Sequence, residues 1–131
     1  MPYTPRGFTT GNFAPDEQDR SFAYAAMWAG LPASLGLLLS LYFGPFPILT
    51  PLCSGITAGS LIALVFSWSH DEFARAQIGF AANWALAFAG IILMWELVPF
   101  AEGSGADLRW TLAIMATIFH LALAWRRWRD R

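Results

Sequence analysis

The feature that most constrains this chain is a long stretch without charge. The fifty residues from Ser21 to His70 contain no Asp, Glu, Lys or Arg. One crossing of a ~30 Å hydrocarbon core takes about 20 apolar residues, so the stretch is long enough for two crossings. The whole chain of 131 residues is 56% hydrophobic and 13% charged, against about 25% charged in soluble domains. The sequence therefore predicts an integral membrane protein.

The predicted fold is an all-α bundle of four transmembrane helices in two hairpins. Helices are expected because lipid offers no partners for backbone N–H and C=O groups. The turn signal Gly44-Pro45-Phe46-Pro47 ends the first span, the polar segment 69–77 ends the second, and Pro99 ends the third. The expected spans are about 21–43, 48–68, 76–98 and 108–125. They form a domain of residues 15–125, between a flexible cytoplasmic tail (1–14) and a basic cytoplasmic tail (126–131).

The sequence carries three local signals for the helices. Ser69 and Glu72 match a capping box, which would open a helix running from about residue 70 to 98. Asp107 is the expected N-cap of the last helix. Pro32 lies in the middle of the first span and removes one backbone donor, which predicts a kink.

The distribution of arginine predicts the orientation in the membrane. All eight basic residues are arginines, and positive charge is retained on the cytoplasmic side. With both termini inside, only Arg109 lies outside. The sequence therefore predicts a protein of the bacterial inner membrane with both termini in the cytoplasm. The arginines on the cytoplasmic side are then Arg6, Arg20, Arg75, Arg126, Arg127, Arg129 and Arg131.

Small residues recur at four-residue spacing in the first two spans. Gly55 and Gly59 form a GxxxG motif, and Ala26, Gly30 and Ser34 repeat the spacing. Such residues let helix backbones approach closely where lipid provides no hydrophobic drive for association. Two interpretations stay open for this motif: packing within the chain, and self-association or docking of a partner.

Four polar side chains are expected inside the membrane: Ser60, Asn83, Glu96 and His120. At 1.5 Å per residue, Asn83 and His120 both lie ~10 Å from the cytoplasmic ends of their helices, and Ser60 ~12 Å, so the three could meet. The first interpretation is a set of bonds that hold helices together. The second is a proton relay or ligand pocket around His120, because intramembrane ionisable groups are commonly functional. Ligation of haem or a pigment by His120 is a third.

Glu96 is the single carboxylate within an apolar run, one turn from the outer end of its span. It could reach the headgroups or pair with Arg109, and coupling to a proton or cation is the alternative. At the cytoplasmic face, Asp71 or Glu72 could form an ion pair with Arg75 on the helix surface. The alternative is a docking surface for another subunit, formed by Asp71, Glu72, Arg75, Arg126, Arg127 and Arg129.

The sequence contains no constellation for catalysis. No glycine-rich phosphate loop, metal-ligand spacing or activated nucleophile is visible, and Cys53 is the single cysteine. We therefore expect no enzyme, no required cofactor or metal, and no nucleic acid. The leading hypothesis is a small membrane subunit that contacts lipid, and other integral subunits or itself, and stabilises a larger inner-membrane complex. The alternative is a small oligomeric transporter or channel with a path around His120, Asn83 and Glu96.

Overall fold

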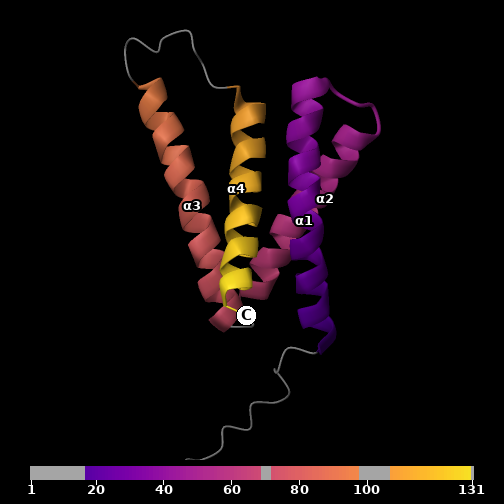
Figure 1. Cartoon of the computed structure of the whole chain (residues 1–131), viewed down its shortest axis with the longest axis vertical. Helices are drawn as coiled ribbons and strands as arrows, with labels where there is room; N and C mark the ends of the chain where they lie inside the picture. Colours follow the sequence, from indigo (N-terminus) through magenta and orange to yellow (C-terminus); the bar gives the residue numbers. More distant parts are fainter. Residues whose placement is uncertain (1–16, 69–71, 98–106, 131) are drawn as a thin grey trace, which may run out of the picture.

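The computed structural model describes residues 17–68, 72–97 and 107–130, and they form a bundle of helices (Figure 1). The elements are α1 (Glu17–Phe43), α2 (Leu49–Trp68), α3 (Glu72–Glu96) and α4 (Leu108–Arg129). Each of these four helices is long and apolar enough to cross a membrane. The prediction of an all-helical chain with four such helices is confirmed for the described residues, and it fits an integral membrane protein.

The helix boundaries lie close to the expected spans. The third helix was expected to reach residue 98, whereas α3 ends at Glu96 and Leu97 lies in a turn. Several of the predicted features lie outside the described residues: Ser69 of the expected capping box, Pro99, the N-terminal tail 1–14, and residue 131 of the basic tail. The helix α1 runs through Pro32 without a break in its assignment, so the proline is accommodated inside a single helix.

Two of the expected helix-end signals are present in the structure. Gly44 follows α1 with a φ of 110°, a backbone conformation that glycine adopts without the strain a Cβ would bring. The Phe46 N–H then donates to Thr50 Oγ1 at 3.0 Å, which closes the turn into α2. At the start of α4, Asp107 Oδ1 accepts a hydrogen bond from the Arg109 N–H at 3.0 Å. The predicted N-cap is confirmed.

The helix α4 occupies the middle of the bundle. It contacts α1 on one side and α3 on the other, while α2 packs mainly along α1 (Figure 1). The end of α3 near Glu96 leans away from α1 and α2. The closest packing therefore occurs between α1 and α2 and between α3 and α4, and α4 also packs against α1.

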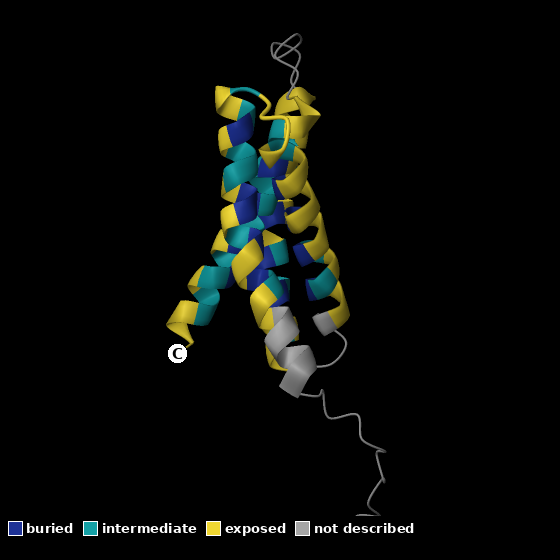
Figure 2. Ribbon diagram, turned by 90° about the vertical axis from the view of Figure 1, so that its right-hand side faces the viewer, coloured by how far each residue is buried: buried dark blue, intermediate teal, exposed yellow. Residues whose placement is uncertain are grey.

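The buried positions of the bundle face inward between the helices (Figure 2). Apart from one apolar cluster, they carry mostly small and polar side chains, whereas many large apolar side chains are exposed. A compact apolar cluster lies where α1 and α3 begin and α2 and α4 end, and consists of Met27, Leu64, Ile78, Ala81 and Leu123. The other buried residues are mostly Ala, Ser, Thr and Cys: Ala33, Ser34, Ser40, Cys53, Thr57, Ser60, Ala85, Ala113 and Thr117. This is the packing expected where helices associate without a hydrophobic drive from water.

Ala81 should tolerate no larger side chain. It is completely buried in the apolar cluster, whereas Ala87 on the same helix is exposed. We expect Ala81→Leu to destabilise the bundle by about 1–3 kcal/mol, because added methyl groups must displace packed neighbours. Ala87→Leu should change stability by less than about 0.5 kcal/mol. Thermal unfolding of both variants in mild detergent measures the difference, and equal stabilities would contradict this packing.

Candidate functional site

The most distinctive polar arrangement is centred on His120 of α4, which is 1% exposed. Its Nε2 lies 3.0 Å from the Ser60 Oγ of α2, and its Nδ1 lies 2.7 Å from the carbonyl oxygen of Ala116 one turn earlier. The Ser60 hydroxyl also reaches the carbonyl oxygen of Ala26 on α1, at 2.7 Å. We call this set, Ala26, Ser60, Ala116 and His120, the polar junction. It links three of the four helices through side-chain contacts.

Gly30 of α1 provides the space for the polar junction. A Cβ at this position would overlap His120 Nε2 and Ser60 Oγ. The imidazole ring and the serine hydroxyl therefore lie directly against the α1 backbone, one turn after Ala26. A glycine is required here because of close approach, since Gly30 lies inside an ordinary helix.

A second layer of hydroxyl groups lies one turn away from the polar junction. On α1, Ser34 follows Gly30 by four residues. On α2 and α4, Thr57 precedes Ser60 and Thr117 precedes His120 by three residues each. All three hydroxyl-bearing residues are buried. Ser34 donates to the Leu31 carbonyl at 2.9 Å and Thr117 to the Ala113 carbonyl at 2.8 Å. Thr57 Oγ1 is buried and has no hydrogen-bond partner among the described residues. The interior polarity thus extends beyond the histidine.

The polar junction is suited to hydrogen bonding and to binding a proton. No group of three or more His, Cys, Asp or Glu residues gathers in the described part of the chain, so the described residues offer no multidentate metal site. Both ring nitrogens of His120 already contact oxygen atoms of the bundle. A haem or pigment needs a free ring nitrogen directed at open space, so the geometry at His120 does not fit axial ligation.

Asn83 and Glu96 do not join the polar junction. Asn83 lies on the exposed side of α3, between the buried positions Ala81 and Ala85. Its depth along the helix was expected to bring it to His120, but its direction around the helix places it outside. Glu96 is exposed at the last residue of α3, and within the described ranges no ion pair joins it to Arg109.

The two groups of small residues lie in different environments. Gly30 and Ser34 are buried and Ala26 is half-buried, at the contact of α1 with α2 and α4. Gly55 and Gly59 of α2 are exposed, and no atom of the described chain lies within 4 Å of a Cβ built on either. The structure therefore places the first group at helix contacts inside the chain and leaves the GxxxG motif on the outside.

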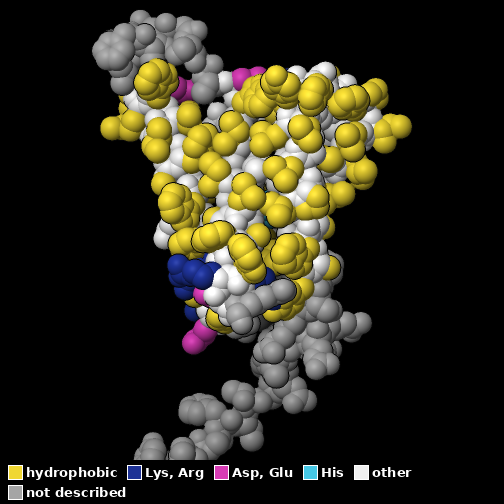
Figure 3. All heavy atoms as spheres, viewed as in Figure 1, with side chains coloured by type: hydrophobic (Ala, Val, Ile, Leu, Met, Phe, Trp, Pro, Cys, Tyr) yellow, Lys and Arg dark blue, Asp and Glu magenta, His cyan; other side chains and the backbone are white. Residues whose placement is uncertain are grey.

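Part of the expected docking surface instead holds the bundle together. Arginines gather at the end of the molecule where α4 ends (Figure 3). The Arg126 Nε lies 3.0 Å from Asp130 Oδ2, and its guanidinium stacks over Phe80 of α3 at 5.4 Å. Arg127 lies over Tyr24 of α1 at 3.3 Å. The exposed charged residues at this end include Glu72, Arg75 and Arg129, whereas Asp71 lies outside the described residues.

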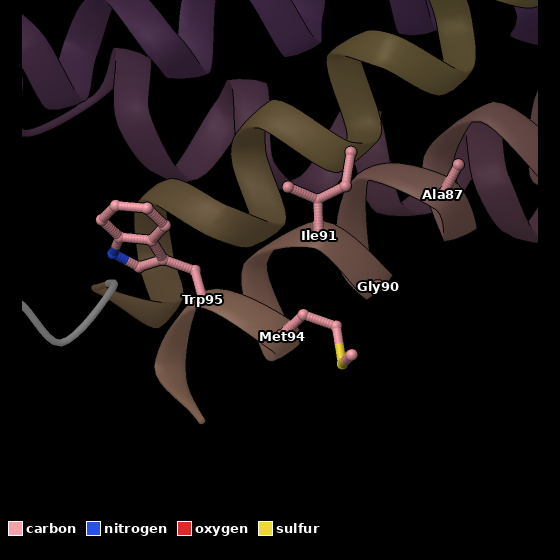
Figure 4. Close-up of a pocket in the computed structure, with 5 residues that line it drawn as sticks. All are labelled: Ala87, Gly90, Ile91, Met94 and Trp95. Atoms are coloured by element: carbon pink, nitrogen blue, oxygen red, sulfur yellow. The ribbon is translucent and has the colours of Figure 1, made fainter. Parts of the chain in front are cut away.

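The sequence reasoning missed one apolar surface on α3. Ala87, Gly90, Ile91, Met94 and Trp95 line a shallow hollow (Figure 4). All five residues are exposed, and a Cβ on Gly90 would meet no atom within 4 Å. The only signal in the sequence was the pair of small residues three positions apart, flanked by larger ones. The hollow lies where α3 leans away from the rest of the bundle.

Comparison with known proteins gives no indication of function for this chain. No protein-family model, curated protein or solved structure matches the chain. What the described residues define is a bundle of four helices able to span a membrane, with a buried histidine–serine junction.

Gly30→Ala tests the close approach at the polar junction. The added methyl group must push His120 or Ser60 away from α1, and overpacking of this kind typically costs about 1–3 kcal/mol. Gly59→Ala is the matched control, because its Cβ would enter open space and alanine favours the helix. Unfolding temperatures in mild detergent should fall for Gly30→Ala alone. Equal temperatures for the two variants would show that His120 and Ser60 do not lie against Gly30.

Proposed function

We propose that this protein is a non-enzymatic membrane subunit that binds and stabilises a larger membrane complex. The partner is another integral membrane protein, and the contact is helix packing. The proposal is based on the surface of α2, on the open packing of α3, and on the confinement of charge to the ends of the bundle.

The helix α2 has two different faces. One is buried in the bundle and carries Cys53, Thr57, Ser60 and Leu64. The other is exposed and carries the two glycines of the GxxxG motif between larger apolar side chains: Leu52, Ile56 and Ile62. We call this second set, Leu52, Gly55, Ile56, Gly59 and Ile62, the α2 outer face.

The single observation that carries the proposal is the open space over Gly55 and Gly59. In a membrane, a groove formed by two glycines one turn apart is the surface on which a second helix packs closely. The bundle places none of its own described helices there. A helix of a partner protein fits this surface because its backbone can approach the glycines and contact the flanking isoleucines.

The hollow on α3 supports the same proposal. The exposed side chains Ile91, Met94 and Trp95 border Gly90, and the neighbouring helices do not cover them. A membrane partner large enough to contact both α2 and α3 would bury both surfaces. The transporter alternative receives less support, since Asn83 and Glu96 are exposed on α3 while His120 is buried between α1, α2 and α4. Within a single chain, these three side chains do not lie together.

The charged residues favour an orientation with two hairpins and cytoplasmic termini. Four arginines belong to the end where α3 begins and α4 ends, where basic side chains gather in Figure 3: Arg75, Arg126, Arg127 and Arg129. Arg109 belongs to the opposite end, where α4 begins. Because positive charge is retained in the cytoplasm, we propose that the arginine-rich end faces it. A bacterial inner membrane is the setting in which this rule orients a chain with such short loops.

Substitution of the α2 outer face should release the partner. We expect the tagged wild-type chain, extracted gently from its native membrane, to copurify with a second membrane protein. Gly55→Leu/Gly59→Leu should reduce that recovery about tenfold, equivalent to about 1.4 kcal/mol of association free energy, because the leucines fill the groove. Quantitative mass spectrometry of the purified material measures the recovery.

The matched control is Ala58→Leu, since Ala58 is also exposed on α2 but lies beside the α2 outer face. It should retain the partner. A wild-type chain that purifies only alone or as a homo-oligomer would defeat the subunit proposal. Loss of the partner in the control as well would remove the assignment of the contact to the glycines.

Cysteine labelling tests the proposed orientation. In a Cys53→Ser background, Pro45→Cys places a thiol at the turn between α1 and α2, and Asp130→Cys places one at the end of α4; both positions are exposed. A membrane-impermeant maleimide added to intact cells should label Pro45→Cys at once and Asp130→Cys only after permeabilisation. The reverse pattern would mean that the arginine-rich end faces outward.

A further inference from the structure

The polar junction contains three close contacts in a row. Starting from α1, they join the Ala26 carbonyl oxygen to Ser60 Oγ at 2.7 Å, Ser60 Oγ to His120 Nε2 at 3.0 Å, and His120 Nδ1 to the Ala116 carbonyl oxygen at 2.7 Å. All three distances lie within the range of hydrogen bonds. Each contact needs one hydrogen atom to be a bond.

The number of available hydrogens depends on the protonation of His120. A carbonyl oxygen only accepts, a serine hydroxyl carries one hydrogen, and a neutral imidazole carries one N–H. A neutral His120 therefore leaves two hydrogens for three contacts, and one contact sets two lone pairs face to face. An imidazolium donates from both ring nitrogens, which gives three hydrogens for three contacts.

We propose that the polar junction is a reversible proton-binding site at His120. In the protonated state Nε2–H donates to Ser60 Oγ, Ser60 donates to the Ala26 carbonyl, and Nδ1–H donates to the Ala116 carbonyl. When the proton leaves Nε2, the Ser60 hydroxyl rotates and donates to that nitrogen, and Ala26 keeps only its helical hydrogen bond.

The proton is held by oxygen atoms and not by a counter-ion. The described parts of α1 and α2 around the junction, residues 24–66, carry no Asp, Glu, Lys or Arg, and their titratable groups are Tyr24, Tyr42 and Cys53. On α4 the charged groups lie at the two ends: Asp107, Arg109, Arg126, Arg127, Arg129 and Asp130. The charged groups of α3, which packs against α4, are Glu72, Arg75 and Glu96.

The nearest of these charges on the histidine's own helix are cationic. Arg126 and Arg127 follow His120 by six and seven residues, ~9 and ~10 Å along the helix. Arg127 stacks over Tyr24. Without a carboxylate nearby, the affinity for the proton depends on the acceptor oxygens, because hydrogen bonds to a charged donor are worth about 1.5–3 kcal/mol each. Ser60 should therefore control the affinity although it does not itself titrate. The inference is independent of the proposed partner of the α2 outer face.

Nitrogen-15 spectroscopy of the imidazole rings tests the proposal directly. The full chain carries two histidines, so in the His70→Gln variant the only imidazole signals are those of His120. In bilayers, we expect both ring nitrogens to carry hydrogens at the lowest pH at which the protein stays folded. As the pH rises, Nε2 should lose its hydrogen while Nδ1 keeps its own, bonded to Ala116. A ring that stays neutral at every pH at which the protein is folded would overturn the proposal, as would loss of hydrogen from Nδ1 first.

A pair of serine variants distinguishes the hydrogen bond from Ser60 to His120 from the general effect of removing a buried hydroxyl. Ser60→Ala removes the acceptor for Nε2–H, and the proton affinity of His120 should fall about tenfold, a shift of about one pH unit in the titration. Ser34→Ala is the control, because this buried hydroxyl bonds its own helix at Leu31 and should leave the titration unchanged. Identical titrations of Ser60→Ala and the wild type would show that the hydrogen-bond chain does not hold the proton.

Discussion

The close approach of α1, α2 and α4 at the polar junction is the constraint on which the rest of the bundle depends. A buried hydroxyl or imidazole without partners is costly, because no water replaces the lost hydrogen bonds. Ser60 and His120 contact one another and two backbone carbonyls only if three helices meet at one level. Gly30 allows that meeting, since any side chain there would occupy the same space as the ring and the hydroxyl. The helix rotations follow from these contacts.

The same constraint explains why the interior is polar and the exterior apolar. Large side chains such as Leu39, Ile62 and Trp84 are exposed, which would be unfavourable in water but suits a bilayer. Buried positions on α1, such as Ala33 and Ser34, keep the helix backbones close. Short side chains also shorten the distance that a hydrogen bond must span. Small residues and polar contacts are thus two parts of one packing solution.

The sequence predicted where the helices lie in the chain better than how each helix is rotated about its axis. The positions of the four helices follow from bilayer thickness and from the location of charged, proline and glycine residues, and Asp107 was identifiable as a cap from local chemistry alone. The depths of Ser60, Asn83 and His120 also follow from the helical rise. Depth does not specify rotation, and Asn83 lies outside while Ser60 lies inside. Rotation is set by contacts between helices far apart in the sequence, which no local pattern of polar residues records.

The rotation of α2 about its axis determines both which of its residues face the interior and which lie on the outer surface. Successive residues of a helix are separated by about 100°, so Thr57 and Ser60 lie nearly opposite Gly55 and Gly59. Once Ser60 is directed at His120, the GxxxG glycines must face away from the bundle. A rotation that buried the glycines would withdraw Ser60 from His120 and expose its hydroxyl. The hydrogen bonds of the polar junction therefore determine which face of α2 stays exposed, so that one helix carries both a buried hydrogen-bonding residue and the exposed GxxxG glycines.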